Sequence, residues 1–143
     1  MKKILLILVL CLSTIGLAGC GNKLPDKVEL TPENNYSVTV GADIKEGKKY
    51  YLEIEGDFEN ELKSQGFGDD DNILMIFSNN NQSNGIILSM SEISNGNTKI
   101  AIDFKVENND IISIGIRDNV SSMRYDKRGF DRYPNNKFYI ISE

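Results

Sequence analysis

The chain of 143 residues contains no histidine and no tryptophan, and its two cysteines, Cys11 and Cys20, lie within the first twenty residues. Without histidine there is no Ser-His-Asp or Cys-His catalytic centre, and no imidazole to bind a metal ion. Beyond Cys20 there is no thiol for a disulfide, a nucleophile or a zinc site. Carboxylates, lysine, tyrosine and hydroxyl groups are therefore what remains for chemistry.

The longest apolar run of the chain stands at its N-terminus. Lys2 and Lys3 precede an apolar stretch that begins at Ile4, and three small or aliphatic residues stand directly before Cys20. This order is typical of a cleavable secretory signal. Counted from Ile4 to Gly19 the segment has sixteen residues, whereas a membrane-spanning helix needs about 20 mostly apolar residues. A cleaved signal is therefore favoured over a spanning helix.

The tetrapeptide Leu17-Ala18-Gly19-Cys20 resembles the lipobox of bacterial lipoproteins. The resemblance implies that residues 1–19 are a signal peptide cut off before Cys20, and that the Cys20 sulfur receives a diacylglyceryl group. The protein would then be held by its lipid on the extracytoplasmic face of the cell membrane. Two acyl chains give lasting attachment, since a single chain binds only marginally.

Removal of residues 1–19 leaves 124 residues, a length suited to one domain with its own core. Residues 20–35 are polar and contain two prolines, so they are predicted to be the lipidated N-terminus and an extended tether. Residues 36–143 are predicted to form the domain. Without the two N-terminal lysines, 14 basic side chains face 21 acidic ones, a formal charge of −7. Such a surface repels nucleic acid, which is therefore not an expected partner.

Apolar and polar residues alternate with period two over much of this domain, which is typical of strands with one buried face. The run at 73–77 is continuously apolar and indicates a strand buried on both faces. Short strands joined by glycine and Asx turns predict an all-β fold, an antiparallel β-sandwich or jelly roll with seven to eight strands. The runs that carry this prediction are 36–40, 50–55, 73–77, 85–90, 99–106, 111–116 and 138–141.

The segment Val40-Gly41-Ala42-Asp43-Ile44-Lys45-Glu46-Gly47, with Tyr50 after it, resembles the V-G-x-D-I-x-x-G-x-Y segment of small β-sandwich modules in Gram-positive exported proteins. Two lysines separate Gly47 from Tyr50, where that pattern has one residue. The resemblance implies the sandwich fold and carries no activity.

All four arginines lie in residues 117–137, which carry six basic and three acidic side chains. Residues 50–110 carry three basic and twelve acidic ones. Arginine binds phosphate or carboxylate through two parallel hydrogen bonds, and aromatic rings add stacking surface. We therefore expect a recognition loop for an anionic envelope polymer or a partner's acidic patch; the alternative is pairing with the domain's own acidic strands. The candidate binding residues are Arg117, Arg124, Tyr125, Lys127, Arg128, Phe130, Arg132 and Tyr133.

Asp69, Asp70 and Asp71 form a second candidate site, because calcium binds six to eight oxygens and clustered carboxylates offer several. The EF-hand spacing is absent, since residue 73 is isoleucine, so a solvated acidic turn is the alternative. Apart from calcium, no cofactor is expected.

Together these features predict a cell-envelope lipoprotein whose non-catalytic extracytoplasmic domain binds a ligand or a protein partner. One alternative is a structural, exclusion or immunity lipoprotein of the envelope. Another is a wall-active enzyme that uses two carboxylates across a sugar, although no such pair can be singled out in the sequence.

Overall fold

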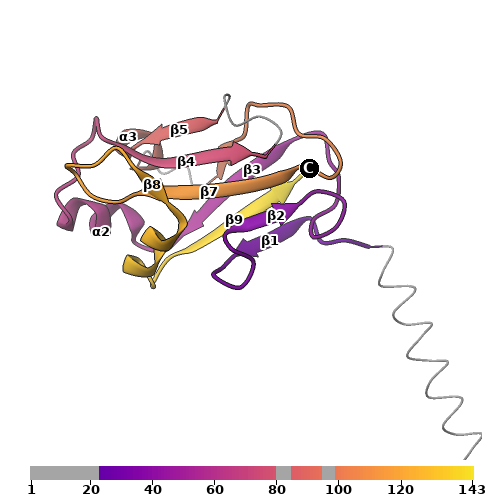
Figure 1. Cartoon of the computed structure of the whole chain (residues 1–143), viewed down its shortest axis with the longest axis horizontal. Coiled ribbons are helices and arrows are strands. Elements are labelled where there is room, and N and C mark those ends of the chain that lie inside the picture. Colours follow the sequence, from indigo (N-terminus) through magenta and orange to yellow (C-terminus); the bar gives the residue numbers. More distant parts are fainter. Residues whose placement is uncertain (1–22, 80–84, 95–98) are drawn as a thin grey trace, which may run out of the picture.

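Two antiparallel sheets make up the domain in a computed structural model that describes residues 23–79, 85–94 and 99–143 (Figure 1). Cys20 lies outside these residues. The first sheet has the strand order β1 (Lys27–Leu30), β9 (Lys137–Ser142), β3 (Tyr50–Glu55), β6 (Lys99–Ala101). The second has the order β2 (Ser37–Thr39), β7 (Ile111–Arg117), β4 (Asn72–Ser78), β5 (Ile86–Ser89), and β8 (Tyr125–Asp126) pairs with β7. The predicted all-β antiparallel sandwich is confirmed.

The core lies between the two sheets. Alternation along β7 turns its isoleucines into this space, as the period-two pattern predicted. The second sheet contributes further buried side chains from β4, and the first sheet contributes them from β3 and β9. The side chains at the centre of the core are fully buried: Leu52, Leu74, Ile76, Ile112, Ile114, Ile116 and Ile140.

Strand β1 corrects the predicted boundary between tether and domain. Lys27 lies opposite Ile141 and Leu30 opposite Phe138, so part of the segment predicted as tether is a paired strand. The sequence hides this strand because it has only four residues and stands at a sheet edge, where its register comes from β9. The folded domain therefore begins before residue 36.

The strand predicted at 99–106 is shorter in the structure and ends at Ala101. Its alternation continues, since Ile102 is buried and Asp103 is exposed. The partner strand β3 begins at Tyr50, whose carbonyl accepts the Ile102 N–H at 2.9 Å. Because β3 starts at Tyr50, it offers no further backbone with which the residues after Ile102 could pair.

The residue types of the turn at Val40–Gly47 are explained by the local contacts that they make. The Asp43 carboxylate accepts the Thr39 N–H at 2.8 Å, and Gly41 has a φ of +85°, which favours glycine. Val40 and Ile44 are both buried and form a bridge. These contacts close the connection between β2 and β3.

Among the described residues, three short helices accompany the sheets: α2 (Phe58–Ser64), α3 (Met90–Ser94) and the 3-10 helix η2 (Lys127–Arg132). Helix α2 buries Phe58 and Leu62, which are one turn apart. In the parts of the chain that the structure describes, no helix is long and apolar enough to cross a membrane.

The sandwich has two different ends along its longest axis (Figure 1). The chain enters the described structure at residue 23, at one end, and the C-terminus lies toward that end too. Strand β8, helix η2 and the loop between β7 and β8 lie at the opposite end. The fold therefore separates the N-terminal entry from the arginine-rich window.

Candidate functional site

Arg117, the last residue of β7, is turned into the protein and its side chain is only 7 % exposed. Its guanidinium donates to the main-chain carbonyls of Val120 and Ser122, each at 2.6 Å, and to that of Asn72 at 3.2 Å. Its Nη1 also lies 3.4 Å from Asp71 Oδ1. Arg117 is therefore an internal brace for the loop that follows it.

Arg132, at the end of η2, braces the same loop from the other side. Its Nη2 donates to the Arg117 carbonyl at 3.1 Å, and its Nη1 donates to the carbonyl of Asp118. Its Nε donates to the Gly129 carbonyl at 3.4 Å. Two of the four arginines thus hold main-chain oxygens, a role that charge counting in the sequence does not reveal.

Arg124 and Arg128 point outward, with side chains 69 % and 82 % exposed. They share one carboxylate, because Arg128 Nη2 lies 3.1 Å and Arg124 Nη2 3.7 Å from Asp126 Oδ2. Asp126 also caps η2 by accepting the Arg128 N–H at 2.9 Å. This main-chain bond, followed by the Arg128 side chain, lowers the pKa of the Asp126 carboxyl. Each guanidinium keeps donors that Asp126 does not use.

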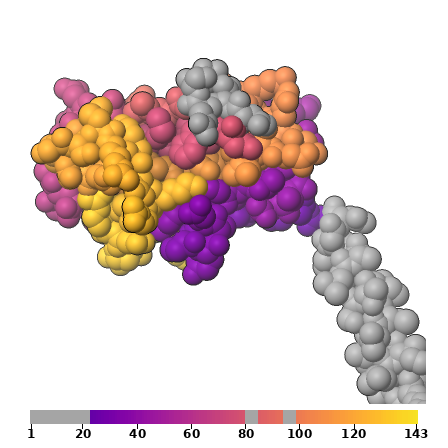
Figure 2. All heavy atoms as spheres, in the orientation of Figure 1, coloured from indigo at the N-terminus to yellow at the C-terminus, as the bar shows by residue number. Residues whose placement is uncertain are grey.

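A hollow of about 350 Å³ lies between these groups. Its lining contains three arginines, 124, 128 and 132, and two carboxylates, so its formal charge is positive. The protein as a whole is acidic. In Figure 2 orange and yellow late-chain residues fill most of this end of the molecule, with earlier, magenta residues at its edge. The lining residues are Asp118, Arg124, Asp126, Arg128, Gly129 and Arg132.

The aromatic residues predicted as stacking surface are packed inside the domain. Phe130 is 3 % exposed and stacks on Tyr36 with ring centroids 4.7 Å apart. Tyr133 is 1 % exposed and meets Phe58 edge-on at 5.4 Å. Tyr125 is half-buried, and burial raises the pKa of its hydroxyl. The sequence shows that these rings lie in residues 117–137, but it does not show that they point into the core.

Lys127 is half-buried as well. Its Nζ donates to the Ser37 hydroxyl at 2.9 Å, and burial lowers the pKa of its ammonium group. The contact joins η2 to β2. Lys127 therefore links two elements of the domain, and it is not among the residues that line the hollow.

The acidic turn predicted as a calcium site is linked to the arginine window. Asp69 and Asp70 are exposed, whereas Asp71 accepts the Gly68 N–H at 2.7 Å and faces Arg117 with its other oxygen. Over the ranges described above, no group of three or more cysteines or carboxylates is placed to hold a metal ion. The calcium site stays a prediction from the sequence.

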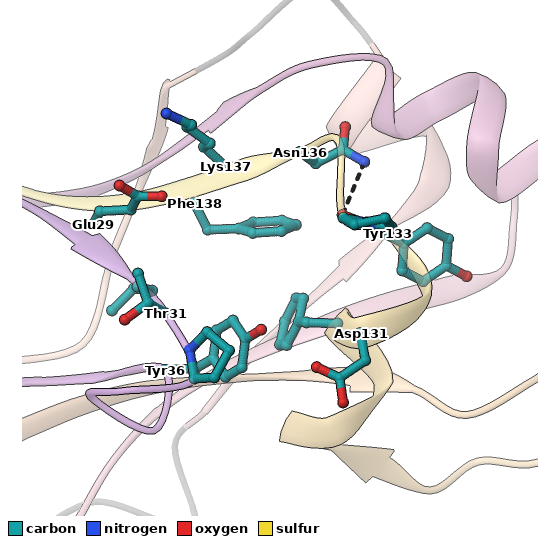
Figure 3. A pocket seen from close by; sticks show the side chains of 12 residues that line it. Glu29, Thr31, Tyr36, Asp131, Tyr133, Asn136, Lys137 and Phe138 are labelled. Atoms are coloured by element: carbon teal, nitrogen blue, oxygen red, sulfur yellow. Dashed lines mark hydrogen bonds between the residues drawn. The ribbon is translucent and has the colours of Figure 1, made fainter.

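A second pocket, of about 330 Å³, opens beside η2 (Figure 3). Glu29 and Asp131 lie on opposite sides of it, with the Phe138 ring between them. Tyr36 contributes to the wall from a backbone with a φ of +50°, unusual for a bulky residue. Burial, reinforced by the Asp131 and Glu33 carboxylates, raises the pKa of the Tyr36 hydroxyl. Sequence reasoning missed Glu29 and Asp131 because they are far apart in the chain and only the tertiary structure places both at one pocket.

Two kinds of chemistry are therefore available: anion binding by the exposed guanidinium pair, and carboxylate chemistry in the aromatic pocket. Neither arrangement can be assigned by similarity. No protein-family model matches this chain, and comparison with curated proteins and with solved structures gives no significant match.

Proposed function

We propose that this chain is a lipid-anchored protein of the cell envelope whose β-sandwich binds an anionic ligand or a protein partner outside the cell membrane, without catalysis. The observation that carries the proposal is the exposed pair Arg124 and Arg128, which share the Asp126 carboxylate. Arg128 belongs to η2 and Arg124 directly precedes β8, and these elements lie at the end of the sandwich opposite the point where the chain enters the described structure. The lipid itself would be carried by Cys20.

The corrected boundary of the domain supports this arrangement. Six residues separate Cys20 from the start of β1 at Lys27. Even fully extended, six residues reach about 20 Å. A lipid on Cys20 would therefore keep the N-terminal end of the sandwich close to the bilayer and leave the arginine end directed away from it.

Charge distribution favours selective binding at this end. The segment after the proposed cleavage site carries a formal charge of −7, so most of its surface repels anions. At physiological ionic strength screening acts over about 8 Å, which limits repulsion from distant carboxylates. An anionic group in the hollow would meet the arginines 124, 128 and 132, whose charge exceeds that of the Asp118 and Asp126 carboxylates beside them, and guanidinium forks suit phosphate or carboxylate.

The anchor is tested by metabolic labelling with radioactive palmitate. We expect label on the wild-type protein and none on a Cys20→Ala variant, together with a mature N-terminus at Cys20. An unlabelled wild-type protein with an uncut N-terminus would contradict the anchor.

The binding site is tested with the double variant Arg124→Gln/Arg128→Gln and purified envelope material. We expect binding to be lost while the thermal midpoint stays unchanged. Lys105→Gln is the matched control, because Lys105 is 81 % exposed and lies outside the hollow. Wild-type binding by the double variant would remove the arginine pair from the proposal and favour a structural or exclusion role.

The carboxylate pair Glu29 and Asp131 supports a second candidate function, a wall-active enzyme, because both groups line one pocket as glycosidase chemistry requires. Turnover of wall glycans that is lost in both Glu29→Gln and Asp131→Asn, but kept in Glu107→Gln, would favour it. Glu107 is the control because its side chain is 64 % exposed and lies outside this pocket.

A further inference from the structure

Exposed apolar side chains gather at the arginine end. Within the described ranges, three large hydrophobic residues are exposed: Ile87 at 43 %, Val120 at 40 % and Met123 at 64 %. Two of the three stand in the seven-residue loop 118–124 that joins β7 to β8. Arg124 follows Met123 directly, so exposed apolar and cationic side chains stand next to each other in one short segment.

This loop is held from inside. The carbonyl of Val120 accepts from buried Arg117, while the Val120 side chain faces outward. The loop closes with the Asp118 N–H donating to the Arg124 carbonyl at 2.9 Å. Asn119 adds a further turn, because its side-chain oxygen accepts the Ser121 N–H at 2.9 Å. A loop with so many internal bonds loses little conformational freedom on binding, which favours affinity.

The combination distinguishes among anionic partners. A linear polyanion would use the guanidinium groups and gain little from exposed apolar side chains. A folded protein gains from both, since methionine and arginine are enriched in protein interfaces and arginine is frequent among their hot spots. Scattered exposed hydrophobic residues need no explanation, but here two stand on a braced loop beside two exposed cations.

We propose that the surface formed by Val120, Met123, Arg124 and Arg128 docks a folded protein whose apolar pocket receives Met123 and whose rim carboxylates meet the two arginines. This inference rests on the proposed function and names its partner class. Charge complementarity favours this occupant, because the hollow beside this loop has a positive formal charge on a chain that is acidic as a whole. Val120 lies at the edge of the proposed contact. Its Cγ2 would be 3.5 Å from a Cβ added to Gly66, so the Val120 side chain packs next to that glycine.

The test uses the full, anchored protein in living cells with a photoreactive amino acid in place of Met123. We expect irradiation to give one protein adduct, which is identified by mass spectrometry. The same photoreactive residue in place of Lys105 is the matched control and should not give that adduct. The identified protein is then purified and its dissociation constant for the full chain is measured.

Variants then separate the contributions. Met123→Ser should weaken binding of that protein about tenfold or more. Ile87→Ser, the matched exposed apolar residue on β5, should leave the dissociation constant unchanged. Arg124→Gln should weaken binding and reduce its dependence on salt.

An adduct with a wall polymer, an adduct with a second copy of this chain, or no adduct at position 123 would each overturn the inference. If Met123→Ser binds envelope material normally and the double arginine variant does not, the inference fails and the proposed function stands. If both bind normally, both fail.

Discussion

Arg117 Nη1 lies 3.4 Å from Asp71 Oδ1, which ties the end of β7 to the acidic turn before β4. The two regions appear as separate candidates in the sequence, one basic and one acidic. In the structure they form one network, in which the carbonyl oxygens of the loop 118–124 accept from the same guanidinium. The shape of the proposed docking surface therefore depends on Arg117, which is buried and is not itself part of that surface.

Arg117→Gln should destabilise the protein by about 2–4 kcal/mol, because three partly buried carbonyls and Asp71 lose their donor at once. Arg124→Gln is the control and should change stability by less than about 0.5 kcal/mol, as is usual at exposed positions. Urea unfolding of the purified variants measures both. Equal stabilities would contradict the bracing role of Arg117.

Gly129→Ala tests how closely η2 packs on β7. A Cβ at this position would stand 2.3 Å from Ile116 Cγ2, so either η2 or the Ile116 side chain must shift. We expect a loss of about 1–3 kcal/mol, the usual range for overpacking. At Gly68 the nearest atom, Asp71 Oδ2, would be 3.6 Å away, so Gly68→Ala is the matched control. A shift in the thermal midpoint of Gly68→Ala as large as that of Gly129→Ala would remove the packing argument.

Asp126→Asn should strengthen binding of an anionic partner. The substitution keeps a side chain able to cap η2 and removes the charge that Arg124 and Arg128 now share. Titration calorimetry with the partner identified by cross-linking would measure the gain. Asp70→Asn, which changes an exposed carboxylate outside the hollow, should leave the affinity unaltered.

The same variant has a predicted pH signature in stability. The pKa of Asp126 is lowered from its usual value of 3.8 in the folded protein, so the folded state favours the ionised form. This contribution is fully present above the usual value and is lost as the pH falls through the lowered folded pKa. We expect the wild type to be more stable than Asp126→Asn near neutral pH, with the difference vanishing in strong acid. A difference independent of pH would show that the charge is not involved.

Calcium should not raise the thermal midpoint. Both oxygens of Asp71 already face donors, the Gly68 N–H and the Arg117 guanidinium, and that cation opposes a metal ion beside it. A true site would add about 2.7 kcal/mol at a calcium concentration of a hundred times its dissociation constant. Calorimetric scans with calcium and with chelator decide between these outcomes, and a midpoint that rises with calcium would support the site predicted from the sequence.

Much of the fold followed from alternation. The runs at 50–55 and 111–116 correspond to β3 and β7, whose apolar residues are spaced as one buried face requires. Strands β1 and β8 escaped prediction because they have four and two residues, too few for a period to show. Their existence depends on the longer strands beside them.

The candidate site was only partly predictable. Clustering of the arginines between 117 and 137 is visible in the sequence, yet nothing there distinguishes Arg117 and Arg132 from Arg124 and Arg128. Arg117 is the last residue of β7, which lies inside its sheet, and its side chain is buried. Arg124 stands at the end of the loop 118–124, and its side chain is exposed to solvent.

By itself, the sequence determined that the domain is built of short strands, that it has no imidazole, and that its positive charge is concentrated late in the chain. These are properties of residue type and spacing, which need no partner segment. Tertiary structure alone decided which cations face solvent, because burial depends on what packs against a side chain from distant parts of the chain. The same packing set Glu29 opposite Asp131 and brought Asp71 to Arg117, contacts that no local pattern encodes.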